Sequence, residues 1–347
     1  MKFLFIHQNF PGQFKHLAPA LVRAGHEVKA LVLNTKLPKL WNGIEIISYT
    51  LHRSSTPNIH PWAGDLESKI IRGEACLTAS LALREAGYQP DKIIAHPGWG
   101  ESLFLKNVWE NTRLGIYCEY YYQPRGADVH FDNEFPSGDS LSASKLMIKN
   151  VNNELHFNIA DSAICPTAWQ AKSFPESFRN SISVIHEGIN TDDLVPHPNV
   201  KLNFGAGLTL TKDNEVVTFV SRNLEPYRGF HIFMRILPEL LKERPLATIL
   251  IVGGDEAGYG AKPDKEAYGD RTWKQIYIDE IGRSIDSKDW SRIKFLGKIP
   301  YSKFVQVLQV STVHVYLTYP FVLSWSLIEA MSIGCAIVAS NTPPVLE

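Results

Sequence analysis

The sequence contains no apolar run long enough to cross a membrane, since none approaches the ~18 uncharged apolar residues that a spanning helix requires. Its first apolar run, Phe3 to Ile6, ends at once in the polar residues His7, Gln8 and Asn9, so it is too short for a signal peptide. We therefore expect a cytoplasmic protein.

Cysteine and net charge are equally scarce. The four cysteines are scattered without a CxxC pair, which is typical of buried thiols in a reducing compartment and predicts neither disulfides nor a zinc site. The 35 Lys and Arg residues balance 36 Asp and Glu residues, which argues against a nucleic-acid surface and gives a membrane surface little to attract. Peripheral contact with a membrane stays open. The cysteines are Cys76, Cys118, Cys165 and Cys335.

The remaining composition, 44% hydrophobic and 20% charged over 347 residues, is that of an ordinary folded protein. At about 150 residues per domain, this length predicts two domains. Short aliphatic runs alternate with helix-period stretches, and the alternation occurs twice, which is typical of βαβ units around parallel sheets. We expect strands at 3–7, 27–33, 92–95, 114–118, 162–166 and 182–186, and then at 216–220, 247–252, 292–295, 313–317 and 336–339.

Two helices are expected in the first half, at 13–24 and 141–160, the second with an apolar face formed by Ile148, Val151, Leu155 and Ile159. The pattern predicts an α/β protein of two doubly wound, Rossmann-like domains. They span 1–193 and 214–347, joined by a linker at 194–213 that carries proline and glycine. We expect the active site in the cleft between them, beyond the carboxyl ends of the strands.

The segment Gly253 to Asp270 breaks this rhythm, because it holds five glycines and is longer than a usual connection. Two interpretations are open. The segment is either a mobile lid over the cleft or a solvated surface insertion.

Two strand ends carry candidate phosphate-binding residues. The first strand of the second half delivers Arg222 and Arg228, whose guanidinium groups suit a diphosphate; the alternative is that they pair on the surface with Glu215 and Glu225. A later strand leads to Ser324, a candidate N-cap whose helix start would offer unpaired N–H donors to a phosphate. Inside that helix, Glu329 could accept hydrogen bonds from two ribose hydroxyls, although a helical glutamate is more often solvated.

The order of these motifs resembles that of the retaining family 4 glycosyltransferases with the GT-B fold, in which two such domains face each other across a cleft. In the second half the order is Arg222 and Arg228-Gly229, then Val252-Gly-Gly, Phe295-Leu-Gly and Leu327-Ile-Glu-Ala-Met. In the first half, Gly12 and the phrases at 21–28 and 184–192 are similar to the family's opening and to the end of its first domain.

The resemblance implies roles for individual residues. Arg222 and Arg228 would hold the donor diphosphate, and Glu329 would bind the nucleotide ribose as the second glutamate of an E-x7-E motif. The backbone of Val322, Leu323 and Ser324 would pass beneath the donor sugar and β-phosphate. The loop formed by Gly297, Lys298 and Ile299 would face the base, and Gly12 would let donor and acceptor approach the backbone.

Three departures from the family pattern stand out. Phe321 occupies the place of the first glutamate of the E-x7-E motif, so the sugar contact is either made by backbone amides or lost. Glu119 lies where many relatives place a histidine near the anomeric carbon. The sequence ends at Glu347, where relatives continue with a strand and a helix, so we expect a shortened second domain.

The first half also holds candidate acceptor residues. His96, at a strand end beside Gly98 and Gly100, could orient or deprotonate an acceptor hydroxyl, or it could merely brace the turn through a backbone hydrogen bond. Tyr120, within a run of three tyrosines, and Arg125 could stack on an acceptor sugar, with at least one tyrosine of the run in the core.

Together these features predict a retaining glycosyltransferase that moves a hexose from a nucleoside-diphosphate sugar to a saccharide or lipid-linked glycan in polysaccharide synthesis. UDP and glucose are favoured by their frequency in the family. Charge on the leaving diphosphate would be met by Arg222, Arg228 and the helix start at Ser324, so no metal or other cofactor is expected. Glu119 and His96 would position the acceptor and offset positive charge on the sugar, with a covalent route through Glu119 left open.

Other functions remain possible on this sequence. An epimerase or a phosphorylase could share the architecture, although no lysine stands out as a carrier of pyridoxal phosphate. A nucleotide-sugar-binding protein with little turnover is suggested by Phe321 and by the shortened end. A dehydrogenase is disfavoured, because residues 9–14 lack the GxGxxG pattern that receives a dinucleotide pyrophosphate.

Overall fold

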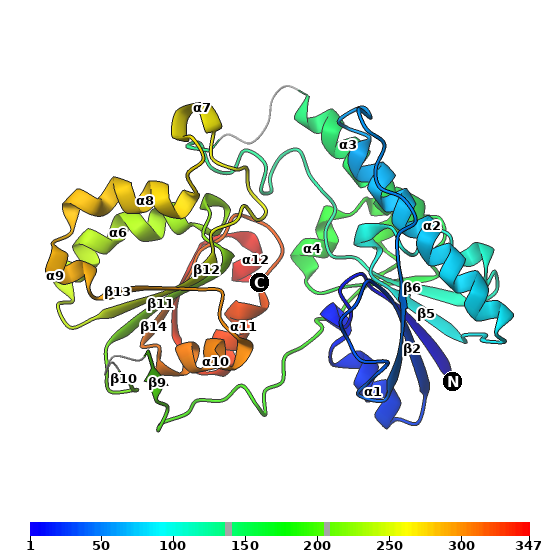
Figure 1. Cartoon of the computed structure of the whole chain (residues 1–347), viewed down its shortest axis with the longest axis horizontal. Coiled ribbons are helices and arrows are strands. Elements are labelled where there is room, and N and C mark those ends of the chain that lie inside the picture. The colour runs from blue at the N-terminus through cyan, green and yellow to red at the C-terminus, as the bar shows by residue number, and fades with distance from the viewer. Residues whose placement is uncertain (136–140, 205–208) are drawn as a thin grey trace. The chain divides into compact units, whose positions relative to one another are not determined.

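The computed structural model describes residues 1–135, 141–204 and 209–347, and the chain forms two compact units. The first unit comprises residues 1–129 and 138–188 together with Glu347, and the second comprises residues 130–137 and 189–346. Figure 1 shows both units, and each is described by itself. No helix among the described residues is long and apolar enough to span a membrane.

The first unit is built on an eight-stranded sheet in the order β3-β4-β2-β1-β5-β6-β7-β8, parallel except at the β3–β4 pair. Alternate residues of β1 point to opposite faces, so Phe3 and Phe5 enter one core while Leu4 and Ile6 enter the other. The strands are β1 (Lys2–Ile6), β2 (Glu27–Leu33), β3 (Leu40–Trp41), β4 (Ile44–Tyr49), β5 (Lys92–Ala95), β6 (Arg113–Tyr117), β7 (Ser162–Cys165) and β8 (Ile182–Val184). The helices are α1 (Leu17–Arg23), α2 (Gly64–Glu85), α3 (Ser142–Phe157), α4 (Ala168–Ser173) and α5 (Glu176–Arg179).

The second unit contains a five-stranded parallel sheet in the order β13-β12-β11-β14-β15. Helices α6 and α8 contribute to the core on one side of it, while α10 and α11 contribute to separate clusters. The strands are β11 (Val216–Asn223), β12 (Thr248–Gly254), β13 (Ile293–Gly297), β14 (Val313–Tyr316) and β15 (Ala336–Ala339), with a small antiparallel pair of β9 (Leu202–Asn203) and β10 (Thr209–Leu210). The helices are α6 (Phe230–Glu243), α7 (Lys265–Tyr268), α8 (Trp273–Ile281), α9 (Ser287–Trp290), α10 (Tyr301–Val310), α11 (Trp325–Ser332) and α12 (Pro343–Leu346).

The two doubly wound sheets confirm the predicted fold class, and each predicted strand is present. The strands at 27–33, 92–95 and 336–339 have the predicted ends, and the others are shifted at one or both ends by one to three residues. The prediction for the apolar face of α3 is confirmed only in part, because Ile148 and Val151 are half-buried and Ile159, beyond the end of the helix, packs against a core cluster. Leu155 is exposed, whereas the polar residues Asn150, Asn152 and His156 are buried. They are buried because they form hydrogen bonds: Asn152 donates to the Pro97 carbonyl at 2.9 Å, and His156 lies 2.8 Å from the Ser102 hydroxyl.

A short segment from the first half of the chain packs on the second unit. The Asp132 carboxylate accepts a hydrogen bond from the Tyr319 hydroxyl at 2.8 Å and lies 3.1 Å from Nε2 of His231. The Phe135 ring meets His231 and Trp273 edge-on. This segment therefore helps to fix Tyr319, which lies in the loop after β14.

Candidate functional site

Strand order places the candidate residues at the point in each sheet where the direction of winding reverses. In the first unit β1 has β2 on one side and β5 on the other, so the loops that follow β1 and β5 lead away in opposite directions. In the second unit β11 stands in the same relation to β12 and β14. Such reversals open the crevices in which α/β proteins bind ligands.

A directed chain of hydrogen bonds begins at His7, immediately after β1. The Asn9 N–H donates to Nδ1 of His7 at 2.9 Å. Because a backbone N–H can only donate, Nδ1 carries no proton and Nε2 must hold it in the neutral ring. Nε2 then donates to Oε1 of Gln13 at 2.8 Å. Burial and, to a smaller extent, the nearby His96 together lower the pKa of His7 to about 4, so the ring is neutral at pH 7.

The chain ends on Glu119, which follows β6. Gln13 uses its amide nitrogen to donate to Oε1 of Glu119 at 3.1 Å. The other oxygen, Oε2, lies 3.6 Å from Nε2 of His96. Burial acts to raise the pKa of the Glu119 carboxyl, but His96, His7 and Gln13 outweigh it and lower that pKa. Glu119 is therefore a carboxylate at neutral pH, with Oε1 held by Gln13 and Oε2 facing His96.

His96 is held in one orientation by its surroundings. The Gly98 N–H donates to its Nδ1 at 3.1 Å, which leaves the proton on Nε2, the atom that faces Glu119. The ring is stacked on Tyr117, with ring centroids 5.4 Å apart, and the centroids of the His96 and Trp99 rings are 4.6 Å apart. The sequence left two roles open for His96, bracing the turn through a backbone hydrogen bond and lying beside the reacting groups. The structure shows the backbone bond to Gly98 and places the ring beside Glu119, so the two are compatible.

Gly12 leaves room for the His7 ring because it has no side chain. It has φ +45°, and a Cβ atom there would lie 2.3 Å from Nε2 of His7. The His7 ring can therefore occupy its position only if residue 12 has no side chain.

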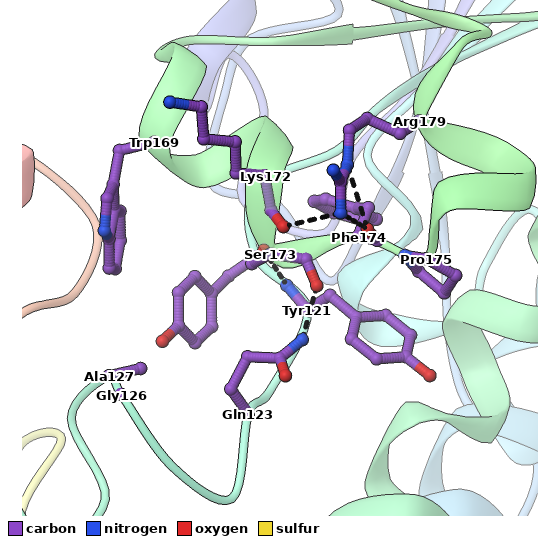
Figure 2. Close-up of a pocket in the computed structure, with 11 residues that line it drawn as sticks. Tyr121, Gln123, Gly126, Ala127, Trp169, Lys172, Ser173, Phe174, Pro175 and Arg179 are labelled. Atoms are coloured by element: carbon purple, nitrogen blue, oxygen red, sulfur yellow. Dashed lines mark hydrogen bonds between the residues drawn. The ribbon is translucent and has the colours of Figure 1, made fainter.

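Tyr120 lies beside this cluster and lines a pocket of about 390 Å³ in the first unit (Figure 2). Its ring is buried and stacked on Trp169, with centroids 5.9 Å apart and planes 26° apart. The buried ring confirms that one tyrosine of the run belongs to the core. Figure 2 also shows Gln123 bonded to the Ser173 carbonyl, and Lys172 and Arg179 on the same wall. Arg125 is exposed and does not line this pocket.

In the second unit the two predicted phosphate-binding arginines have different environments. Arg222 is exposed at the end of β11, whereas Arg228 is only 8% exposed. Nη1 of Arg228 donates to the Thr318 hydroxyl at 2.7 Å. No residue in the described part of the chain accepts a hydrogen bond from its other nitrogens, so those N–H groups can serve an anion.

The alternative surface pairing of these arginines is wrong. Glu215 pairs with Arg244 instead. The Glu225 carboxylate accepts backbone N–H groups from the glycine-bearing segment, from Gly258 to Gly260.

The start of α11 differs from the expected set of unpaired donors. Ser324 is its N-cap, as predicted, but the Ser326 N–H already donates to the Ser324 hydroxyl at 3.4 Å. The Ser324 N–H donates to the Tyr316 hydroxyl at 3.0 Å. Burial raises the pKa of Tyr316, and the charge of Arg228 opposes that rise.

Glu329 is buried inside α11, so the solvated position that is usual for a helical glutamate is excluded. Its Oε1 accepts a hydrogen bond from the Tyr301 hydroxyl at 2.7 Å. A carboxylate that is already held by one hydroxyl retains acceptor sites for others.

The remaining predicted donor residues lie in two loops. Phe321 is buried between Tyr227 and Tyr259, with ring centroids 5.4 and 5.1 Å away, and is followed by the half-buried Val322 and Leu323. In the other loop Gly297 has φ +63°, Ile299 packs against a core cluster, and Lys298 pairs with Glu256 at 2.7 Å. Among the described residues no three His, Cys, Asp or Glu side chains gather closely enough to hold a metal ion.

Several residues of these sites were not predicted as functional. His7 was seen only as the end of an apolar run, although a polar residue directly after a buried parallel strand is itself a signal. Gln13 and Tyr301 carry no such signal, because the carboxylates that they contact, Glu119 and Glu329, lie 106 and 28 residues away in the chain.

Two family models match the chain in succession. Residues 24–194 match a glycosyl transferase family 4 group and residues 214–347 match the glycosyl transferases group 1. No curated protein matches the chain.

Among solved structures, the chain is similar to the Anabaena protein HepE in complex with UDP and glucose. Identity is 18% and the TM-score is 0.62, with 100% of this chain and 82% of that chain covered. A sucrose-phosphate synthase from Thermosynechococcus elongatus gives 17% identity and a TM-score of 0.67, with 99% and 82% covered. The catalytic domain of starch synthase IV from Arabidopsis thaliana, bound to ADP and acarbose, gives 13% and 0.61, with 99% and 83% covered. These likenesses confirm the GT-B fold.

Proposed function

The chain belongs to the glycosyltransferases, with a family 4 domain followed by a group 1 domain, and from that premise we propose that it is a retaining enzyme using a nucleoside-diphosphate hexose. The acceptor is a hydroxyl of a saccharide or lipid-linked glycan in polysaccharide synthesis. UDP-glucose is the favoured donor, because the similar Anabaena structure holds UDP and glucose. We expect it to act in the cytoplasm, with peripheral membrane contact where the acceptor is lipid-linked.

The observation that carries the proposal is the buried Arg228 guanidinium. Thr318 holds one of its nitrogens, and no other described residue accepts from the rest. As the glycosidic bond to the donor breaks, negative charge grows on the diphosphate, and a preoriented cation in a partly dry site stabilises it without reorganising. Arg228, with Arg222 and the start of α11, is proposed to supply this stabilisation without a metal ion.

Glu329 would hold the ribose of the nucleotide. Its buried carboxylate already accepts one hydroxyl, that of Tyr301, and a ribose diol would take the same kind of bond. Gly297, Lys298 and Ile299 would face the base, and the backbone of Val322, Leu323 and Ser324 would lie beneath the sugar.

The lowered pKa of Glu119 supports one of its possible tasks. A carboxylate that is stabilised as the anion is a weak proton acceptor, so it suits charge stabilisation better than general base catalysis. The acceptor's proton would then pass to the leaving diphosphate on the same face of the sugar. Glu119 and His96 would offset positive charge on the ring and orient the acceptor. A covalent route through Glu119 is the alternative.

The pocket at Tyr120 supports a saccharide acceptor. Flat aromatic rings pack on the C–H faces of sugars, and the half-buried Trp169, backed by Tyr120, offers such a ring in the pocket that Gln123 and Lys172 also line (Figure 2). Arg125 would contact the acceptor outside the pocket wall.

One observation favours a second candidate, a nucleotide-sugar-binding protein with little turnover. Phe321, packed between Tyr227 and Tyr259, stands where the family that the chain resembles has the first glutamate of its E-x7-E motif. The sugar contact of that carboxylate would therefore be made by backbone amides or be lost, and its loss would give this second candidate.

Calorimetric titration with UDP, GDP, ADP and their glucose forms tests the proposal. We expect one nucleotide to bind the wild type, with about tenfold or greater loss in Arg228→Ala and Glu329→Ala, because each would lose a hydrogen bond to a charged group. Arg271→Ala, which removes a surface arginine paired with Asp279, is the control and should bind normally. Binding that is unaffected in both site variants would refute the assignment of the donor site. Binding without release of nucleoside diphosphate would favour the second candidate.

A further inference from the structure

The glycine-bearing segment between β12 and α8 is fixed at its centre by one buried carboxylate. Glu225 is 1% exposed, and it accepts backbone N–H groups from Gly258 at 3.1 Å, Tyr259 at 3.0 Å and Gly260 at 3.0 Å. In the described part of the chain no cationic side chain pairs with Glu225. The loop amides are therefore the groups that compensate its charge, and such charge-assisted bonds are about twice as strong as neutral ones.

The two glycines make this contact possible. A Cβ atom on Gly258 would lie 2.2 Å from Oε1 of Glu225, and one on Gly260 would lie 3.3 Å from Oε2. Side chains at these positions would hold the backbone off the carboxylate. Gly258 and Gly260 therefore allow the loop backbone to approach the Glu225 carboxylate closely. A lid that opened at this point would have to break all three hydrogen bonds.

Tyr259, between those glycines, is consequently held against Arg228. The ring centroid of Tyr259 lies 5.0 Å from the guanidinium carbon, and 5.1 Å from the centroid of Phe321. Tyr259 is 47% exposed, so burial of the ring is not what keeps it against Arg228. Its contact with the guanidinium acts together with the bond to Thr318, and the two fix Arg228 from two directions.

We propose that Glu225 and Tyr259 are positioning residues of the donor site. Glu225 holds the turn from Gly258 to Gly260, and through it Tyr259 orients the Arg228 guanidinium toward the diphosphate. This inference rests on the proposed function, because it takes Arg228 as the diphosphate ligand.

The contact between the Glu225 carboxylate and the three loop amides is tested first in the ligand-free protein, by hydrogen exchange at the amides of Gly258, Tyr259 and Gly260. Glu225→Gln replaces one acceptor oxygen by a donor that faces the loop amides. We expect exchange at these amides to be at least about tenfold faster in Glu225→Gln than in the wild type. Equal exchange in the two proteins would show that Glu225 does not hold these amides, and would overturn the inference whatever nucleotide the protein binds.

The positioning role is tested by calorimetric titration with UDP, or with the nucleoside diphosphate that binds the wild type best. We expect Tyr259→Ala and Glu225→Gln each to weaken binding about tenfold, the size of a partly desolvated cation–aromatic contact. Tyr259→Phe keeps the ring and should bind within twofold of the wild type. Tyr268→Ala, a tyrosine of the same segment that contacts Arg271 and Trp273 instead, is the matched control and should also bind normally.

A double-mutant cycle separates positioning from general loosening of the structure. In the Arg228→Ala background, Tyr259→Ala should cause no further loss of UDP affinity, because its effect passes through Arg228. Additive losses would overturn the role of Tyr259. Wild-type UDP affinity in both Tyr259→Ala and Glu225→Gln would overturn the inference and leave the proposed function intact. A wild type that binds no nucleoside diphosphate would overturn both.

Discussion

Replacing Glu101 by glutamine should stabilise the protein in alkaline solution. Glu101 is 0% exposed, and neither of its carboxylate oxygens has a hydrogen-bond partner among the described residues. Burial raises the pKa of this carboxyl from 4.5 to about 7, against weaker opposing effects of its own backbone amide, Arg72 and His96.

The sign follows from proton binding. The unfolded chain loses this proton near pH 4.5, whereas the folded protein keeps it to about pH 7. Stability therefore falls as the pH rises through this window. Since each pH unit corresponds to about 1.4 kcal/mol, ionised Glu101 costs the folded state on the order of 3 kcal/mol above pH 7.

Denaturant unfolding of the wild type and Glu101→Gln at pH 4, 6 and 8 measures this cost. The stability of the variant relative to the wild type should rise by up to about 3 kcal/mol from pH 4 to pH 8. The pH-dependent part of the difference is the readout, since any fixed cost of the amide cancels. Glu74→Gln, at an exposed position on α2, is the control and should show no such rise. A pH-independent difference, or one that falls with pH, would refute the reasoning.

Three further predictions concern the first-unit site and the buried histidines. Burial lowers the pKa of His7, His156 and His314 to about 4, so the unfolded chain gains protons first as the pH falls, and stability should drop between pH 6.5 and 4. The measurement is made in Glu101→Gln, because the opposite effect of Glu101 falls in the same pH range. Equal unfolding free energies of this variant at pH 7 and pH 5 would contradict the prediction. Gly12→Ala should displace the His7 ring and lower turnover at least about tenfold, whereas Gly25→Ala, at φ +82° in open space, should only destabilise slightly; unfolding and rate measurements on both variants decide. Gln13→Leu removes the bond that holds Glu119, and should lower kcat about tenfold to a hundredfold with nucleotide affinity unchanged; a loss confined to nucleotide affinity would count against it.

The sequence predicted the sheets because their strands are continuous apolar runs with turn residues between them. It did not predict β3 and β4, since the edge strand β3 has two residues and β4, next to it, alternates in polarity. Hydrophobic periodicity also predicted the buried face of α3 only in part, because buried Asn152 and His156 bond to loops that come from distant parts of the chain.

The candidate sites divide in the same way. Arg228, Ser324 and Glu329 were found because each lies within a local strand–loop–helix pattern. The orientation of Glu119 was not, because it depends on His7 and Gln13, which meet it only after β1, β5 and β6 have paired side by side. Tyr259 likewise reaches Arg228 through a carboxylate 34 residues earlier in the chain. No local pattern encodes such contacts.

The central claim is that this protein breaks the bond between a sugar and a nucleoside diphosphate at a site containing Arg228. The most direct measurement is phosphorus NMR of UDP-glucose, and of its ADP and GDP counterparts, incubated with the wild type, Arg228→Ala and Arg271→Ala in the presence of an acceptor glycan, with water as the other hydroxyl that can take up the hexose and give its proton to the diphosphate. The account predicts release of free nucleoside diphosphate by the wild type and by Arg271→Ala, and little release by Arg228→Ala. Release at the enzyme-free rate from every donor, or undiminished release by Arg228→Ala, would contradict it.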